Sequence, residues 1–387
     1  MGVGHSDAAD LAVAGAEAVT AAVAGRDAAL VLVFCPIQED YTGLLDAVRA
    51  GAGPGAAVAG CTSFGQVVAE DPAGNGQGVL VMALGGDGLS VRTRVALDAS
   101  EDRRRAGIEA GGCLEGIEEP NRVCMLLADG LIGEQHELVR GVYSVAGAGV
   151  PLVGGCAADN LAYGRTAQFH GDAQGVQVLH DSVVGIGLGS TGPIATGIAH
   201  GWRKVGEPML VTSSSGGRLR ELDEGPALEA YLRRVGKSRD EVNTSEDLRQ
   251  FAFSHPLGLS RRTGEDIRVI HGGDFEAGEL LCLADVPQGA LAWLMETDPE
   301  SLILGAKESV AQAVAGLDGA PPVGVLTFDC GARRIMLGEQ GLEQEIGAMS
   351  AVLGDVPFGG FYTYGEIART QGARGMHHLT VVSLALG

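Results

Sequence analysis

Short runs of apolar residues, each bounded by glycine, recur along this chain. A run of four to eight apolar residues is typical of a strand that is buried on both faces. The pattern therefore predicts buried strands at residues 29–34 (ALVLVF), 78–84 (GVLVMAL), 123–128 (VCMLLA), 182–189 (SVVGIGLG) and 323–328 (VGVLTF).

Between these runs, apolar residues recur at the spacing of a helix. Three sets of residues each share one helix face. The sets are Leu44, Leu45 and Val48; Leu138, Val142 and Val145; and Ile346, Met349 and Leu353. Strands that alternate with amphipathic helices predict an α/β fold in which helices cover the sheets.

A strand, an amphipathic helix and a glycine-rich turn follow one another three times. The turns read AAVAGCTSFGQ, VPLVGGCAADN and VPFGGFYTYGE. The separation between strand end and turn is the same in the first two cases, Cys35 to Gly60 and Asp129 to Gly154, and slightly longer in the third, Cys330 to Gly359. We therefore expect two sheet-and-helix domains with repeated strand–helix–glycine-turn units. The alternative is that the same pattern arose without duplication, and it stays open because the copies have little sequence similarity.

The length of 387 residues is too great for one ordinary core and indicates at least two domains. Residues 213–217 are polar and flexible in composition. A helix start follows them, with Pro226 near the first helical position and Glu229 in the first turn. We expect an N-terminal helical segment at residues 1–28, a first α/β domain at 29–215 and a second at 216–387.

The net charge of −22 disfavours binding to nucleic acid or to an anionic membrane surface, since both carry negative charge. The alanine-rich N-terminal segment lacks the basic stretch of a secretory signal peptide, and no apolar run is long enough to cross a bilayer. The seven cysteines are widely spaced and form no CxxC pair, which favours a reducing compartment. We expect a cytoplasmic protein.

Small or polar residues follow the predicted strands, where open parallel sheets bind their ligands. Cys61 and Thr62 lie in the first turn, Asp129 at a strand end, and Gly155 and Cys156 in the second turn. A carboxylate at a strand end needs a partner or a ligand. The alternative interpretation of the cysteines is that they are ordinary buried residues.

The segment HGWRKVGEP contains a second set of candidates. Trp202 lies beside Arg203, so a planar ligand could stack on the indole while the guanidinium binds a carboxylate or phosphate. The alternative is a tryptophan that covers a core. His255 precedes Pro256, which keeps it extended, and it is either a ligand or base or a polar residue of a loop.

The third turn is unusual in carrying two of the six tyrosines, Tyr362 and Tyr364, just before Glu366. In an extended strand, positions 362 and 364 point to the same side. Two phenols beside a carboxylate predict a flat wall with polar tips, suited to a small ligand. The alternative is a pair of tyrosines that shields a sheet face.

No signature of a known catalytic mechanism is present. There is no HExxH and no GxSxG, and the nine histidines have no metal-ligand spacing. We therefore expect a protein that is not an enzyme.

Ten motifs, in order and over nearly the whole chain from about residue 29, together resemble the FIST domain family, which has FIST N and FIST C halves. They are AAVAGCTSFGQ, LLADGL, ELVRGVY, PLVGGCAAD, VGIGLG, HGWRKVGEPMLVT, ELDEGPALEAYL, HPLGL, VLTFDCGARRIMLG and GFYTYGEIAR. The resemblance implies a sensory role in signal transduction, with a small ligand such as an amino acid. Some family members bind haem as nitric-oxide sensors that regulate a histidine kinase. The resemblance therefore also implies haem as a candidate cofactor, with His200 and His255 as candidate ligands.

The leading hypothesis is a stand-alone cytoplasmic sensor. It would bind an amino-acid-like metabolite or haem and signal to a separate partner such as a histidine kinase. The alternative is an enzyme acting on a small acid or amide with Asp129, Glu366 and the tyrosines, where Tyr362 or Tyr364 donates a proton and Glu366 accepts one. A third hypothesis, a pure scaffold for a kinase, would need no ligand.

Overall fold

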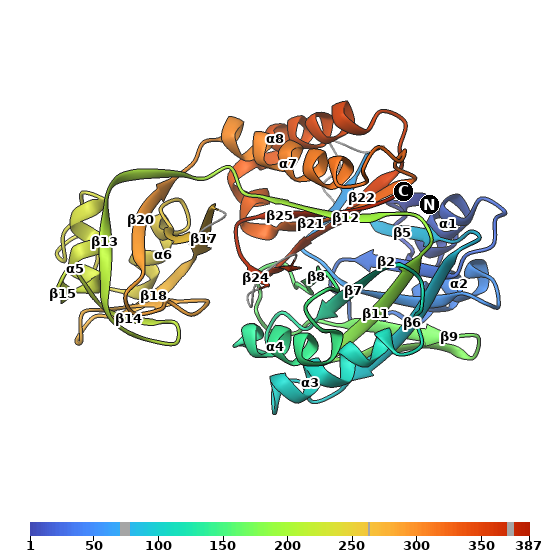
Figure 1. Cartoon of the computed structure of the whole chain (residues 1–387), viewed down its shortest axis with the longest axis horizontal. Coiled ribbons are helices and arrows are strands. Elements are labelled where there is room, and N and C mark those ends of the chain that lie inside the picture. Colours follow the sequence, from blue (N-terminus) through green and yellow to red (C-terminus); the bar gives the residue numbers. More distant parts are fainter. Residues whose placement is uncertain (70–77, 262–263, 370–374) are drawn as a thin grey trace. The chain divides into compact units, whose positions relative to one another are not determined.

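The chain folds into two compact units (Figure 1). The computed structural model describes residues 1–69, 78–261, 264–369 and 375–387. The larger unit consists of residues 1–200, 303–376 and 380–387, and the smaller unit of residues 201–302 and 377–379. These units are defined by packing in space, and the domain boundaries expected after residues 28 and 215 remain predictions.

Three sheets form the larger unit. The first has the order β1 (Gly2–Ser6), β5 (Val79–Leu84), β2 (Leu30–Cys35), β3 (Ala57–Thr62), β9 (Gln168–Asp172) and β10 (Gly175–Leu179). The second has the order β24 (Met376–His377), β23 (Glu366–Arg369), β8 (Leu152–Cys156), β7 (Asn121–Ala128), β11 (Val183–Ser190) and β6 (Leu89–Ala96). The third has the order β12 (Ile194–Ala199), β25 (Val381–Leu386), β21 (Gly324–Cys330), β22 (Phe358–Thr363) and β4 (Gln66–Val68).

Both faces of the central strands are buried, which explains their continuous apolar runs. In β2, Leu30, Leu32 and Phe34 belong to a core to which all three sheets contribute. The alternate residues Val31 and Val33 pack in a second cluster with residues of helices α1 (Leu11–Val23) and α2 (Thr42–Ala52). The five predicted buried strands correspond to β2, β5, β7, β11 and β21 and are confirmed.

Helices cover the sheets of the larger unit. Besides α1 and α2 they are α3 (Arg103–Gly111), a 3-10 turn at Gly112–Leu114, α4 (Gln135–Ala146), most of α7 (Pro299–Ala315), and α8 (Gly331–Leu353). Helix α1 packs beside α2, and α3 beside α4 (Figure 1). The predicted helix faces are buried except for Val145, which is 49% exposed. That prediction was wrong because Val145 lies in the last turn of α4 against Gly111, which has no side chain to cover it.

Three strand–helix–strand segments have the same connection, and we call them modules. Module 1 is β2–α2–β3, module 2 is β7–α4–β8 and module 3 is β21–α8–β22, and the two strands of each are parallel neighbours. The strand that follows each module pairs with a different module: β4 with β22, β9 with β3, and β23 with β8. That the modules are copies of one repeated unit stays a prediction.

The smaller unit has its own sheet and core. The sheet has the order β17 (Gly264–Arg268), β16 (Leu257–Arg261), β20 (Leu291–Glu296), β13 (Arg203–Ser215), β14 (Arg218–Leu222), β19 (Glu279–Cys282) and β18 (Ile270–Asp274), with β15 (Gly225–Pro226) paired to β14. Helices α5 (Ala227–Arg234) and α6 (Ser245–Ala252) contribute to its apolar core. The predicted helix start is confirmed, since Pro226 immediately precedes α5.

The chain therefore has a mixed α/β fold, as expected from the alternation of strands and helices. Among the helices within the described ranges, none is both long enough and apolar enough to cross a membrane.

Candidate functional site

The ends of the three modules meet through backbone hydrogen bonds. The amide of Ala158 donates to the carbonyl of Thr62 at 3.0 Å, and the amide of Tyr364 donates to the carbonyl of Cys156 at 3.1 Å. The amide of Phe64 donates to the carbonyl of Tyr362 at 2.9 Å, which closes a circle of three bonds. We call this circle the strand-end ring. It brings together Thr62, Cys156, Tyr362 and Tyr364, four of the residues that the sequence selected.

Glycine allows the strands to approach one another below this ring. A Cβ atom on Gly60, Gly154 or Gly360 would lie 2.0 Å or less from a backbone carbonyl oxygen of the neighbouring parallel strand. The candidate Gly155 has a similar role on the core side, where a Cβ atom would lie 2.5 Å from Cγ2 of Thr363. Packing therefore requires Gly60, Gly154 and Gly360, which lie in strands β3, β8 and β22 and not in turns as the sequence predicted.

The thiols near the ring are buried and form no disulfide. Burial raises the pKa of the Cys61 thiol well above its ordinary value, and the neighbouring Cys35 and Cys156 add to the effect. Burial likewise raises the pKa of Cys156. Since the thiolate is the reactive form, these cysteines are suited to packing and not to nucleophilic chemistry.

Asp129 has backbone partners. Its carboxylate accepts hydrogen bonds from the amide of Leu131 at 2.8 Å and from the amide of Asp181 at 3.0 Å. The carboxylate of Asp129 thus closes the turn after β7 and connects this turn to Asp181, two residues before β11. A ligand is therefore not needed to explain this buried charge.

Tyr364 belongs to a network at the outer side of the ring. Its hydroxyl donates to Asp159 Oδ1 and accepts from the amide of Leu161, both at 2.6 Å. Asp159 also accepts from the amides of Tyr163, Gly164 and Arg165. Burial acts to raise the pKa of Asp159, but these hydrogen bonds outweigh it, so its pKa lies below the usual value. The sequence placed Asp159 in a candidate turn but gave no sign that it organises the loop after it.

Tyr362 belongs to a different network, between the third sheet and α8. Its hydroxyl donates to Glu345 Oε2 at 3.2 Å. Arg333 lies between two carboxylates, with Nε 2.7 Å from Asp329 Oδ1 and Nη2 2.5 Å from Glu345 Oε1. The guanidinium also donates to the carbonyl of His200 at 3.0 Å. Both carboxyls and the guanidinium are fully buried.

This buried cluster holds two carboxyl groups and one guanidinium. Burial raises the pKa of Glu345 to about 8, and the nearby Asp329 adds to the effect. Burial also raises the pKa of Asp329, although Arg333 acts against it. Sequence reasoning missed all three residues. The spacing of four between Asp329 and Arg333, across a helix start, was the available signal.

Glu366 lies on the core side, in a third network. Thr363 Oγ1 lies 2.7 Å from its Oε1, and both the amide and the hydroxyl of Thr380 donate to Oε2, at 3.1 and 2.9 Å. Tyr362, Tyr364 and Glu366 therefore have different hydrogen-bond partners and do not form the expected wall of two phenols beside a carboxylate. Strand β22 ends at Thr363, so the side chain of Tyr364 no longer follows the alternation of the strand.

The candidates from the HGWRKVGEP segment lie in the smaller unit, except for His200. Trp202 is 6% exposed, and its indole N–H donates to the carbonyl of Leu379 at 3.0 Å. Arg203 pairs with Asp298 at 2.6 Å. Each side chain therefore has a partner within its own unit.

His255 meets one requirement of a haem ligand. Its Nδ1 lies 3.1 Å from the carbonyl oxygen of Phe251, and a carbonyl can only accept. A proton on Nδ1 leaves the lone pair of Nε2 for an iron atom, the usual arrangement for a metal-bound histidine. His200 belongs to the larger unit. Within the described residues, no group of three or more His, Cys, Asp or Glu side chains is placed to hold a metal ion.

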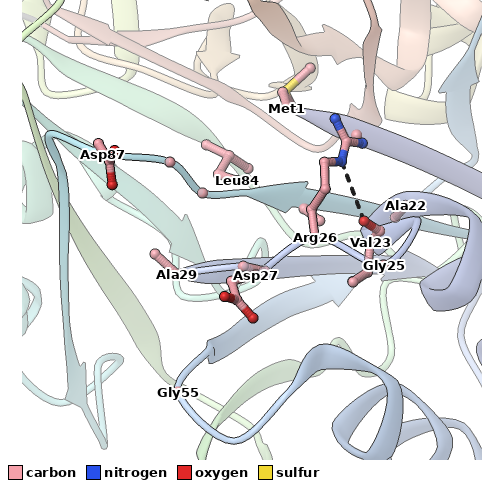
Figure 2. A pocket seen from close by; sticks show the side chains of 15 residues that line it. Met1, Ala22, Val23, Gly25, Arg26, Asp27, Ala29, Gly55, Leu84 and Asp87 are labelled. Atoms are coloured by element: carbon pink, nitrogen blue, oxygen red, sulfur yellow. Dashed lines mark hydrogen bonds between the residues drawn. The ribbon is translucent and has the colours of Figure 1, made fainter.

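A cleft lies at the opposite end of the first sheet, before the amino end of β2. Its volume is about 790 Å³. It is bounded by the end of α1, by Gly55 and by the residues after β5. Figure 2 shows the ionisable side chains that line it, the guanidinium of Arg26 and the carboxylates of Asp27 and Asp87. Sequence reasoning missed this cleft because these residues lie in loops with no motif.

Comparison with known proteins gives consistent matches over the chain. The FIST N domain matches residues 29–225, and the FIST C domain matches residues 227–369. An uncharacterized protein of Mycobacterium tuberculosis (strain CDC 1551 / Oshkosh) is 28% identical over 398 residues, covering 100% of this chain and 99% of that protein. An uncharacterized protein of Mycobacterium bovis is 28% identical over 242 residues, covering 62% of this chain and 60% of that protein. A solved structure of T. maritima PurL complexed with AMPPCP covers 78% of this chain and 73% of its own at 10% identity, with a TM-score of 0.23, too low to imply a shared fold.

Proposed function

The chain belongs to the FIST family of sensory signalling domains, and from this premise we propose that it binds a small ligand and signals to a separate partner such as a histidine kinase. The family match supports the sensory part of the proposal. The description of neither matched domain names an enzyme. The separation of the candidate residues also favours sensing over catalysis, because Asp129, Tyr364 and Glu366 are each hydrogen-bonded to different protein groups.

The ligand class that we propose is an amino-acid-like metabolite bound in the cleft of Figure 2. The cleft carries the proposal because it presents both signs of charge within about 790 Å³. The Arg26 guanidinium would bind the carboxylate of the ligand, and Asp27 or Asp87 would bind its ammonium group. A volume of this size is typical of small-molecule sites.

A thermal-shift and calorimetric screen of the amino acids tests this proposal. A ligand at 100 times its dissociation constant should add about 2.7 kcal/mol to the free energy of unfolding. We expect Arg26→Ala and Asp87→Asn to abolish that gain. Asp46→Asn, an exposed change on α2, is the matched control and should preserve it.

The outcomes separate the two parts of the proposal. If no amino acid stabilises the protein, the ligand class is wrong. If one does but both cleft variants respond like the wild type, the ligand binds elsewhere. The site proposed from the sequence would then be the first to test, at Cys61, Thr62, Asp129, Gly155 and Cys156.

The haem version of the proposal rests on the orientation of the His255 ring. Haem would supply an iron atom to which nitric oxide binds. We expect added haem to give a Soret band that shifts with nitric oxide and is lost in His255→Ala, with His200→Ala as the companion variant. An unchanged spectrum on adding haem would remove this version.

The partner part is tested with a candidate histidine kinase. Its autophosphorylation rate would be measured with and without the chain, and with and without the ligand. A sensor changes that rate only when its ligand state changes. A pure scaffold would bind the kinase regardless of any ligand.

A further inference from the structure

Glu366 is a buried carboxyl group without a cationic partner. Its side chain is fully buried, and it forms no ion pair with any lysine, arginine or histidine in the described ranges. Its partners are the hydroxyl of Thr363 and the amide and hydroxyl of Thr380. Buried charges are normally paired, so a lone carboxylate here needs an explanation.

The pairing of strands identifies two other side chains at corresponding positions. Glu366 is the first residue of β23 and pairs with Gly155, one residue before the ring residue Cys156. Gln168 opens β9 and pairs with Cys61, one residue before the ring residue Thr62. Gln66 opens β4 and pairs with Phe361, one residue before the ring residue Tyr362. The two counterparts of Glu366 are therefore both glutamines.

The hydrogen bonds of the three side chains correspond as well. The amide nitrogen of Gln66 donates to Ser63 Oγ at 3.0 Å, and that of Gln168 donates to Thr166 Oγ1 at 3.2 Å. In both cases the hydroxyl lies two or three residues before the glutamine. Glu366 Oε1 lies 2.7 Å from Thr363 Oγ1, and Thr363 also comes three residues before it. Oε1 of Glu366 therefore occupies the position that the N–H groups have in the two glutamines.

The second oxygen completes the correspondence. Ser182 Oγ donates to Gln168 Oε1 at 2.7 Å, and Thr380 Oγ1 donates to Glu366 Oε2 at 2.9 Å. Ser182 comes just before β11, which pairs with β7 of module 2. Thr380 comes just before β25, which pairs with β21 of module 3. The residue just before β5 is Gly78, which has no hydroxyl, and Gln66 Oε1 has no hydrogen-bond partner among the described residues.

We propose that Glu366 is a proton-binding site, in which a neutral carboxylic acid takes the place that glutamine amides take at the two corresponding positions. The proton is on Oε1 and is donated to Thr363 Oγ1, as the glutamines donate their N–H. Oε2 accepts from Thr380, as Gln168 Oε1 accepts from Ser182. The site is neutral at physiological pH and loses its proton in mildly alkaline solution.

The charges around Glu366 favour the neutral form. Asp329 on β21 and Cys156 on β8 are the ionisable groups that act on it, and each becomes negative if it ionises. Arg333, which faces Asp329, is already engaged by Asp329 and Glu345. Burial is the main cause that raises the pKa of Glu366, to about 8.

The number of protons released on unfolding tests the proposal. It is obtained from the pH dependence of the free energy of unfolding, measured by urea denaturation of the full chain. In the unfolded chain Glu366 is ionised above about pH 5, so the wild type should release one more proton than Glu366→Gln between about pH 5 and pH 7.5. The unfolding equilibrium constant of the wild type then rises tenfold per pH unit relative to the variant.

The control is Glu343→Gln, an exposed change on α8, which should have the pH dependence of the wild type. Equal proton release from the wild type and Glu366→Gln would overturn the proposal. At pH 5 the proposal has Glu366 protonated, and glutamine should replace a protonated acid with little loss of stability. A Glu366→Gln variant that is much less stable than the wild type at pH 5 would therefore also overturn the proposal.

The reverse substitution keeps the proposal testable if Glu366→Gln does not fold. Gln168→Glu introduces an acid beside Thr166 and Ser182, and it should add one released proton over the same pH range. An infrared spectrum of the wild type at neutral pH should also contain a carboxylic-acid band, to which Glu345 contributes as well, and Gln168→Glu should strengthen this band, which disappears as the solution is made alkaline. A Gln168→Glu protein with the proton release of the wild type, or a wild type without such a band, would contradict the proposal.

Discussion

Single side chains around the strand-end ring hold loops through several hydrogen bonds at once. The Tyr364 hydroxyl both donates to Asp159 and accepts from the amide of Leu161. Its ring stacks on Tyr163 with centroids 5.0 Å apart. The phenol therefore anchors the loop that follows β8, whether or not a ligand binds there.

We predict that Tyr364→Phe lowers the free energy of unfolding by about 0.5–1.5 kcal/mol, because one donor and one acceptor lose a partner in a partly buried place. Urea denaturation measures the change. Tyr163→Phe is the control, since Tyr163 is 60% exposed and the substitution retains the stack of the two rings. Equal stability of the Tyr364→Phe variant and the wild type would show that water replaces the hydroxyl without cost.

We predict a larger loss for Arg333→Met. The substitution leaves Asp329 and Glu345 buried without their cation, which typically costs about 3–5 kcal/mol. Arg334→Met is the neighbouring control. It removes a partly exposed guanidinium that lies 5.2 Å from the ring centre of Tyr362, an interaction worth about 0.5–1 kcal/mol at exposed sites. Similar losses in the two variants would mean that the buried pair contributes nothing specific.

The sequence predicts the location of the strand ends better than it predicts which side chains act there. Thr62, Cys156 and Tyr362 lie in β3, β8 and β22, where the sequence predicts glycine-rich turns, but their place near the ends of parallel strands was predictable from the strand–helix alternation. The contact of Arg333 with Glu345 was not. On a straight helix, residues twelve apart differ in direction by about 120°. Gly338 interrupts α8 between Arg333 and Glu345, with φ of 61° and ψ of 180°. The helical spacing rule therefore does not apply across this kink and could not predict the contact.

At the scale of elements, close approach of parallel strands depends on glycine. We predict that Gly360→Ala lowers the free energy of unfolding by about 1–3 kcal/mol or more, because overpacking forces the backbone to move. The new Cβ atom would lie 1.7 Å from the carbonyl oxygen of Thr327. Chemical denaturation, with circular dichroism as the probe, measures the loss.

Gly347→Ala is the matched control, because this glycine is exposed in α8 and has no atom within 4 Å of an added Cβ. It should stabilise the protein by up to about 1 kcal/mol through its better helix propensity. If Gly360→Ala were equally harmless, the strands would not be as close as described.

Strands were predictable where both faces are buried and less so elsewhere. The runs in the larger unit are continuously apolar because sheets and helices enclose them. Strand β13 of the smaller unit is thirteen residues long but largely exposed, so it lacks both a long apolar run and a regular alternation. Its hairpin with β14 encloses residues 216–217, which the composition alone suggested were part of a flexible boundary.

At the scale of the whole molecule, buried acids make stability depend on pH. Burial raises the pKa values of Glu345 and Glu366 from 4.5 to about 8. The folded chain then holds protons that the unfolded chain has lost. We predict that the free energy of unfolding falls as the pH rises from about 4.5 to about 8, by about 1.4 kcal/mol per pH unit for each such group, and levels off above.

Melting temperatures measured across this pH range test the prediction. The net charge of −22 also destabilises the folded chain through repulsion, but this effect is screened at 1 M salt, where the Debye length is about 3 Å. The slope that remains in high salt contains the contribution of the buried acids, opposed by His170 and His271, whose pKa values burial lowers. The same profile in the wild type and in a Glu345→Gln, Glu366→Gln double variant would show that both groups are ionised in the folded protein.

The exchange of strands between modules has a consequence for the origin of this architecture. Because β4, β9 and β23 each complete the sheet of another module, no module can be removed without leaving a gap in one sheet and an unpaired strand in another. A short polypeptide with one module and its following strand would be unable to fold alone. Three such polypeptides, each passing its last strand to the next in a closed cycle, would satisfy the pairings of β4, β9 and β23. The larger unit therefore has, within one chain, the closed threefold pattern of strand exchange that a domain-swapped trimer has between chains.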